Sequence, residues 1–214
     1  MKHILQLTFF IIIFNSCTTY KIVEIKSDGI NTTEKSYIYE NDSVKITYKF
    51  WELNGIMSFD IYNKTNTPLY FDWKKSACII NDKMLSYWQD EVNTEGSSSS
   101  FAYSAVNGTA NSKTKMKSKS IRQERIGIIP PHSLINNTKY YLTNNSILLN
   151  FNLNYTNTST PLRIRNYLAI STNEDFTKNV SYIDNSFYVN KIYKIKSGKF
   201  NESVSNCSFY TKIR

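Results

Sequence analysis

Residues 44–50 read Val-Lys-Ile-Thr-Tyr-Lys-Phe, and residues 57–62 read Met-Ser-Phe-Asp-Ile-Tyr. In both stretches apolar and polar side chains alternate, which is typical of a strand with one buried face. Asn54-Gly55 lies between them, and this dipeptide favours a tight turn because glycine tolerates a positive φ. The sequence therefore predicts a β-hairpin over residues 44–62 that turns at Asn54-Gly55. One face of its first strand carries Val44, Ile46, Tyr48 and Phe50.

Similar short segments recur along the chain. A run of prolines at 130–131 ends one of them, since proline cannot donate to a central strand ladder. Only residues 173–178 could form a helical turn. Strands about 8–12 residues apart, with turn residues between them, predict an all-β fold, an antiparallel β-sandwich. The remaining strand candidates are 69–73, 77–80, 84–88, 124–129, 139–142, 147–153, 162–170 and 186–195.

The composition excludes two broad classes of protein. Of the 214 residues, 41% are hydrophobic and 20% are charged, which fits neither an intrinsically disordered chain nor a membrane protein with several spans. The 16 Tyr and 12 Phe, against 6 Gly and 4 Pro, favour β-structure. The length is enough for one domain or two small ones, and we expect a single β-sandwich domain over residues 17–214.

One segment interrupts the succession of strands. Residues 93–120 hold four consecutive serines at 97–100 and a lysine at every second position from 113 to 119, with few apolar side chains. A loop of this length is unusual inside a compact domain. We expect a long mobile insertion here, and the alternative is an ordered arm that binds a partner.

Residues 1–16 predict an export signal. Lys2 and His3 precede an apolar run at 4–14 that only two polar residues interrupt. A helix of that length covers about 16 Å, which is about half of the ~30 Å hydrocarbon core of a bilayer. A signal peptide therefore fits this segment better than a transmembrane anchor does.

Residues 14–17, Phe-Asn-Ser-Cys, follow that run. They resemble the lipobox of bacterial lipoproteins, with the loose upstream positions found in Bacteroidetes. The resemblance implies that Cys17 is acylated after cleavage, so that the lipid bilayer becomes a partner through Cys17. The alternative is an ordinary secretory signal with an incidental cysteine. Residues 18–22 lack the acidic cluster of surface-exported lipoproteins of this phylum, so we expect attachment to the outer membrane, facing the periplasm.

Several segments between residues 40 and 195 carry a second resemblance. They are Phe-x-Ile-x-Asn at 59–63, Pro-Leu-Tyr-x-Asp-Trp-Lys-x-Ser at 68–76, Asn81, Ile-Pro-Pro-x-Ser at 129–133, and the tracts 165–167 and 184–189. This part of the chain resembles small uncharacterised lipoproteins of Bacteroidetes and, more loosely, immunoglobulin-like extracytoplasmic domains. The resemblance implies an immunoglobulin-like β-sandwich, and it implies no enzymatic activity, since these families have none assigned.

The net positive charge of the chain indicates which classes of partner it could bind. Removal of the signal takes away Lys2 and lowers the formal charge from +9 to +8. Many basic proteins bind nucleic acid, but an exported and tethered chain does not routinely meet it. We therefore expect no nucleic acid partner. Anionic lipid headgroups or an acidic polysaccharide fit better, and an envelope protein or a glycan is the wider expectation.

Three features of the body are candidate sites. In an oxidising compartment Cys78 and Cys207 could form a disulfide, although Cys78 could equally be a buried free thiol. Residues 42–44, Asp-Ser-Val, resemble short O-glycosylation sites of exported Bacteroidetes proteins, which makes Ser43 a candidate.

Aromatic side chains supply the other candidates. Sugars stack on exposed aromatic rings, and regular alternation would place Phe71 and Trp73 on one strand face, with Trp88 as a further candidate. The stronger expectation is that these rings pack between the two sheets, as large aromatic residues of sandwiches usually do, and a ligand platform is the alternative.

Catalytic and metal-binding patterns are weak. After processing His132 is the only histidine and no Gly-x-Ser-x-Gly elbow is present, so we expect no catalytic residues, no metal and no cofactor. Asp60 and Asp72, with Glu52 near the hairpin, could still supply a carboxylate pair.

These observations together predict a membrane-anchored envelope lipoprotein that acts as a binding or structural module and is not an enzyme. The alternative is a hydrolase directed at carbohydrate or peptidoglycan that uses a carboxylate pair. A subunit of an envelope assembly would be a third possibility, and it would show an exposed apolar patch or an open strand edge.

Overall fold

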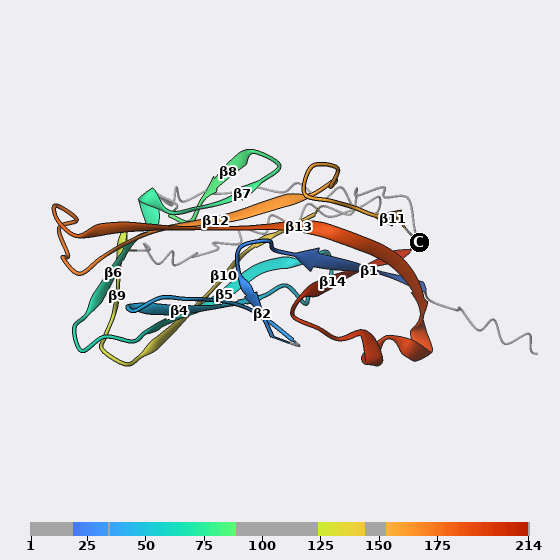
Figure 1. The fold of residues 1–214 in the computed structure, drawn as a ribbon, viewed down its shortest axis with the longest axis horizontal. Coiled ribbons are helices and arrows are strands. Elements are labelled where there is room, and N and C mark those ends of the chain that lie inside the picture. The colour runs from blue at the N-terminus through green and yellow to red at the C-terminus, as the bar shows by residue number, and fades with distance from the viewer. Residues whose placement is uncertain (1–18, 34, 89–123, 144–152, 214) are drawn as a thin grey trace, which may run out of the picture.

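Two antiparallel β-sheets pack face to face in the computed structural model, which describes residues 19–33, 35–88, 124–143 and 153–213 (Figure 1). The predicted all-β sandwich is therefore confirmed. The expected signal at 1–16, the expected lipid attachment at Cys17 and the expected insertion at 93–120 lie outside the described residues. Most of the strand candidate at 147–153 lies outside them as well.

Among the described residues the larger sheet has nine strands in the order β14-β1-β13-β12-β6-β9, with β7, β8 and β11 joined to it beside this path. Its strands are β1 (Thr19–Lys26), β6 (Leu69–Asp72), β7 (Ala77–Ile80), β8 (Lys83–Ser86), β9 (Ile126–Ile129), β11 (Leu153–Asn154), β12 (Arg163–Ser171), β13 (Val180–Lys196) and β14 (Ser208–Ile213).

The smaller sheet has the order β10-β5-β4-β3-β2. Its strands are β2 (Asn31–Thr32), β3 (Tyr37–Glu40), β4 (Val44–Lys49), β5 (Ile56–Asn63) and β10 (Leu134–Tyr141). Short 3-10 turns complete the described structure at η1 (Trp73–Lys75), η2 (Ser197–Lys199) and η3 (Asn201–Ser203). The predicted helical turn at 173–178 is absent, because Asn173 and Asp175 accept backbone hydrogen bonds with their side chains and hold the segment as irregular turns.

The predicted hairpin is formed by β4 and β5, which pair antiparallel from Val44 opposite Asn63 to Lys49 opposite Ser58. Its connection is longer than the predicted tight turn. The amide of Gly55 donates to the carbonyl of Glu52 at 3.0 Å, and Asn54 has a φ of 67°. The loop is long because it also pairs with β14 of the other sheet, where the Asn54 amide donates to the Tyr210 carbonyl at 2.7 Å.

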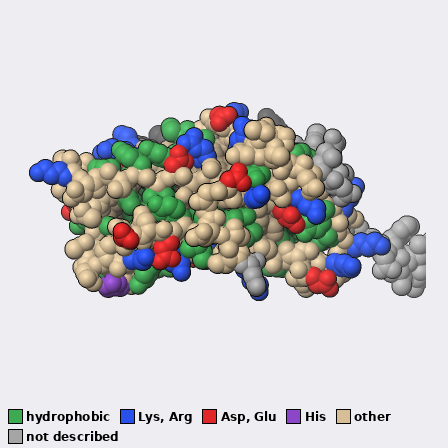
Figure 2. Space-filling view, viewed as in Figure 1, with side chains coloured by type: hydrophobic (Ala, Val, Ile, Leu, Met, Phe, Trp, Pro, Cys, Tyr) green, Lys and Arg blue, Asp and Glu red, His purple; other side chains and the backbone are tan. Residues whose placement is uncertain are grey.

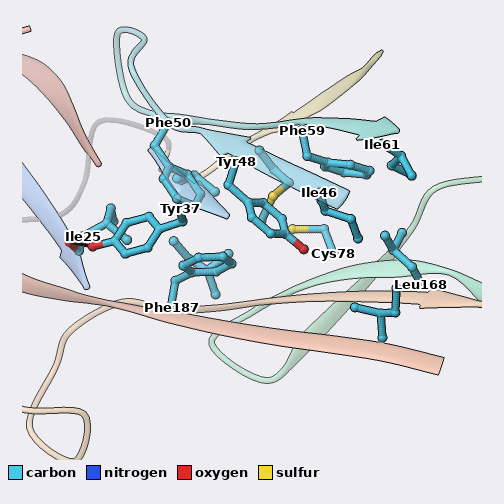
Figure 3. Close-up of a cluster of buried hydrophobic side chains, with 14 of the residues drawn as sticks. Ile25, Tyr37, Ile46, Tyr48, Phe50, Phe59, Ile61, Cys78, Leu168 and Phe187 are labelled. Atoms are coloured by element: carbon cyan, nitrogen blue, oxygen red, sulfur yellow. Dashed lines mark hydrogen bonds between the residues drawn. The ribbon is translucent and has the colours of Figure 1, made fainter. Parts of the chain in front are cut away.

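The core lies between the sheets and is rich in aromatic rings (Figure 3). Val44, Ile46, Tyr48 and Phe50 are all buried, which confirms the predicted face of the hairpin. The ring centre of Phe187, from the large sheet, lies 4.8 Å from that of Tyr48 and 5.0 Å from that of Phe50. Edge-to-face contacts of this kind stabilise a core beyond the area that they bury.

The chain crosses between the sheets after β5, and buried Asn63 holds this crossing. Its Nδ2 donates to the carbonyls of Thr67, Ile129 and Pro130 at 2.8, 3.0 and 3.1 Å. Its Oδ1 accepts from the amide and the hydroxyl of Thr65 at 2.9 and 2.8 Å. The asparagine of the 59–63 segment therefore has a structural role at the point where the two sheets are joined.

Candidate binding face

Phe71 and Trp73 belong to the core, in agreement with the stronger expectation, so they do not form a ligand platform. Phe71 is fully buried, Trp73 is 6% exposed, and their ring centres lie 5.6 Å apart. Regular alternation fails after Phe71 because the carboxylate of Asp72 accepts from the amides of Lys74 and Lys75 and starts the turn η1. The indole of Trp73 then lies against Gly127, where a Cβ atom would come within 2.6 Å of Nε1.

Trp88 is half-buried, and Nζ of Lys74 lies 5.1 Å from the centre of its ring. Its indole Nε1 is buried and has no hydrogen-bond partner within the described part of the chain. The suggestion that Trp88 contacts a ligand stays a prediction.

The structure does not bring Asp60 and Asp72 together. Asp60 alternates with buried Phe59 and Ile61 on β5, so it lies on the outer side of the small sheet. There it forms an ion pair with Lys49 and accepts from Nδ2 of Asn136 at 2.7 Å. The core of the sandwich separates it from Asp72, which lies at the end of β6 in the large sheet.

Asp72 is a buried carboxylate that binds Arg125. Oδ1 accepts from Nε of Arg125 at 3.1 Å and Oδ2 accepts from Nη2 at 2.6 Å. Burial opposes ionisation of Asp72, but the hydrogen bonds from Arg125 and from the amides of Lys75 and Lys74 lower its pKa. Both carboxylates are therefore engaged in structural contacts, and Glu52 accepts from the neighbouring Leu53 amide.

Cys78 and Cys207 are free thiols, so the disulfide that we considered is not formed. Cys78 is buried on β7, and Cys207 directly precedes β14. The order β14-β1-β13-β12-β7 puts four strand spacings, about 19 Å, between these two strands, whereas a disulfide needs Cα atoms within about 7 Å.

Ser43 and His132 both lie in turns. Ser43 is half-buried between β3 and β4, where its amide donates to Oδ1 of Asn41 at 2.9 Å. Glycosylation of Ser43 stays a prediction. His132 has a φ of 53°, and its Nε2 lies 2.8 Å from Oδ1 of Asn66.

The outer face of the large sheet gathers polar and aromatic side chains that sequence reasoning did not assign to a site. In the register of β12 and β13, Arg163 lies opposite Tyr188, Arg165 opposite Ser186 and Tyr167 opposite Asp184. Directly paired residues share one face of a sheet. The intervening residues Ile164, Asn166 and Leu168 are buried on the core side. We call the set Arg163, Arg165, Tyr167, Tyr182, Asp184, Ser186 and Tyr188 the outer strip.

One half of the outer strip is a hollow of about 240 Å³. Arg163 and Arg165 line it, and Asp28, Asp82 and Asn157 lie at its rim on loops. Arg163 donates from Nε to the Asn157 carbonyl at 2.9 Å, and Tyr188 donates to Oδ1 of Asp28 at 3.0 Å. These bonds hold the polar walls of the hollow in place.

The other half of the outer strip is a pair of stacked tyrosines. The rings of Tyr167 and Tyr182 have centres 5.4 Å apart and planes 18° apart, and Tyr182 is 54% exposed. Arg165 pairs with Asp184 in the adjacent row, and this ion pair raises the pKa of Arg165. The Arg-x-Arg-x-Tyr alternation at 163–167 is the sequence signal that could have indicated this face.

The arrangement offers recognition chemistry. A flat aromatic surface lies beside fixed charged donors and acceptors, and a hollow with a mixed polar and apolar lining continues it. Among the residues that the structure describes, no three His, Cys, Asp or Glu side chains gather as metal ligands. Within the same residues, no helix has the length and apolar character needed to cross a membrane.

Comparisons with known proteins give no relative: no family model, no curated sequence and no solved structure matches the chain.

Proposed function

We propose that the protein is an envelope lipoprotein, anchored through acylated Cys17, that binds a glycan on the outer strip of its large sheet. The observation that carries the glycan assignment is the exposed tyrosine pair beside the Arg165–Asp184 ion pair. Within this proposal the sandwich is of the immunoglobulin-like class, and the protein is a binding module that faces the periplasm from the outer membrane.

The tyrosine pair supports a sugar ligand because the C–H face of a pyranose ring is apolar and packs on an aromatic ring, while its hydroxyls need polar partners at the edge. Asp184, directly opposite Tyr167, supplies a fixed acceptor, and Arg165 in the neighbouring row supplies a fixed donor. Arg163 and Arg165 line the adjoining hollow together with Asp28 and Asp82, so it offers both donors and acceptors to sugar hydroxyls. The strip is open and shallow, which suits a glycan chain better than a small buried ligand.

The anchor is supported by the position of Cys17 in the chain. It precedes the first residue of β1, Thr19, by two residues, so the lipid would join the sandwich through a very short link. Two or more acyl chains give stable attachment where one chain is marginal. Metabolic labelling with a fatty-acid analogue tests this part: the wild-type chain should take up label and Cys17→Ala should not.

Binding is tested with the purified domain and a panel of soluble peptidoglycan fragments, alginate and polygalacturonate. Tyr182→Ala should weaken glycan binding about five- to tenfold, because one stacked ring is lost. Tyr141→Ala is the matched control, since Tyr141 is 62% exposed on β10 of the other sheet. If no glycan binds, or if both substitutions weaken binding equally, the outer strip is not a glycan site.

A further inference from the structure

We propose that the end of the sandwich where β1 begins is a membrane-contact surface that lies against anionic lipid headgroups. The surface consists of four aromatic rings, Tyr20, Trp51, Phe200 and Tyr210, and three exposed lysines, Lys196, Lys199 and Lys212. We call it the basal surface. Its orientation in the cell rests on the acylation of Cys17 proposed above, whereas its affinity for lipid does not.

The four rings form one cluster outside the main core. The ring centre of Phe200 lies 4.4 Å from that of Tyr20, 4.8 Å from that of Tyr210 and 5.6 Å from that of Trp51. All four side chains are half-buried, so each ring keeps part of its surface in solvent. The loop of the β4–β5 hairpin supplies Trp51, and the segment that contains η2 and η3 supplies Phe200. Tyr and Trp are the residues that membrane proteins place at headgroup level, because their rings are apolar and their edges are polar.

Lysines converge on the same end of the molecule. In the strand register Thr19 lies opposite Lys196, Tyr20 opposite Lys212 and Lys21 opposite Lys194. Among the described residues no ion pair is formed by Lys196, Lys199 or Lys212. Acidic side chains near this surface include Glu202 on η3 and Glu52, which acts electrostatically on Tyr210. An anionic surface supplies the missing counter-charge.

The figures show the same arrangement. In Figure 1 the start of β1, the turns η2 and η3 and the C-terminal end of the chain lie at one end of the long axis. In Figure 2 lysine or arginine side chains appear at that end.

The chain geometry places this end at a bilayer. One residue, Thr18, separates Cys17 from Thr19, so their Cα atoms are at most about 7 Å apart in an extended chain. The headgroup layer on one side of a bilayer is about as thick, roughly 5–8 Å. A lipid on Cys17 would therefore hold Tyr20 and its neighbours at headgroup depth. Along β13, 12 residues separate Lys196 from Asp184 of the outer strip, or about 40 Å, so the glycan face would stand well above the membrane.

The test uses the mature chain from residue 17 with Cys17→Ser, which carries no lipid, and vesicles of phosphatidylglycerol and phosphatidylethanolamine at low salt. We expect flotation with these vesicles, little flotation with pure phosphatidylcholine, and loss of binding as salt is raised. Exchange of the three lysines for glutamate (Lys196→Glu, Lys199→Glu and Lys212→Glu together) should reduce partitioning at least about 100-fold, since each basic group contributes about fivefold near an anionic surface.

A control variant with Lys75→Glu, Lys83→Glu and Lys178→Glu has the same net charge, with all three changes at exposed positions away from the basal surface. It should keep most of the binding. Quenching by lipids brominated near the headgroup should also disappear in Trp51→Phe, while unfolding curves show that each variant is folded. Equal losses in the two triple variants, or no flotation of the parent chain, would overturn the basal surface. Failure of fatty-acid labelling with intact flotation would instead refute only the anchor.

Discussion

Oη of Tyr48 in the small sheet accepts a 2.7 Å hydrogen bond from Nδ2 of Asn185 in the large sheet, inside the core. Nδ2 of Asn166 donates to the same oxygen at 3.1 Å, and Oδ1 of Asn166 accepts from Tyr87 at 2.7 Å. All four side chains are buried. A buried polar network stabilises a fold when its members are satisfied, so this one favours a single register of one sheet over the other.

Tyr48→Phe should lower the free energy of unfolding by about 2–3 kcal/mol, because it leaves the Nδ2 groups of Asn166 and Asn185 buried without their acceptor. Tyr39→Phe is the matched control. Its hydroxyl accepts one 3.3 Å bond from Asn41 at an exposed position, so its loss should change stability by less than about 0.5 kcal/mol. Urea denaturation measures the free energy of unfolding of both variants. Equal effects of the two substitutions would show that the network does not join the sheets energetically.

The Asp72–Arg125 pair should make stability depend on acidity. The folded-state pKa of Asp72 is lowered, so its ionised form stabilises the fold above the unfolded value of about 3.9. This contribution is lost as the pH falls through the folded-state pKa. Asp72→Asn should therefore cost about 2–3 kcal/mol at pH 7, and its unfolding curve should approach the wild-type curve as the pH falls through the folded-state pKa of Asp72. Asp42→Asn, at an exposed turn, should follow the wild type throughout.

Gly127→Ala should destabilise the domain, although alanine is usually tolerated better than glycine within a strand. The new Cβ atom would lie 2.6 Å from Nε1 and 3.2 Å from Cε2 of Trp73, whose ring is packed in the core. We expect a loss of about 1–3 kcal/mol, as for other overpacked cores. Gly29→Ala, where no atom lies within 4 Å of the new Cβ, is the control and should stay near the wild-type melting temperature. If Gly127→Ala leaves the stability unchanged, Trp73 moves freely enough to accommodate the new methyl group.

Local alternation explains why β4 and β5 could be predicted with their correct faces. Each residue from 44 to 50 indicates its face of the strand by being apolar or polar, and this pattern favours the observed pairing register of β4 with β5. The strand β1 gave no such signal, since Ile22 and Val23 are adjacent and both buried. Its pairing with β13 joins residues more than 160 positions apart, and no local pattern specifies that partner.

Non-local partners also explain the departures from the predicted pattern at the candidate sites. The sequence 71–73 alternates like a strand, but Asp72 caps η1 and binds Arg125, 53 residues away, so Trp73 turns into the core. The outer strip needed the register of β12 and β13, which brings Tyr167 and Tyr182 together from 15 positions apart. The sequence shows that these residues are present, but it does not predict that they share one face of the large sheet.

The cysteines should behave as two independent thiols of different reactivity. Burial raises the pKa of Cys78 to about 12 and also raises the pKa of half-buried Cys207, which hydrogen-bonds to Ser205 and Tyr37. Since the thiolate is the reactive form, both should react slowly with a thiol reagent at pH 8, and Cys78 should react only when the domain unfolds. In the Cys17→Ser chain without reductant, denaturant should expose two thiols. In the Cys207→Ser variant the native protein should no longer react slowly with the thiol reagent, and denaturant should expose one reactive thiol, that of Cys78. Fewer than two thiols in the denatured parent chain would reveal a disulfide, in conflict with the four-strand separation of β7 from β14.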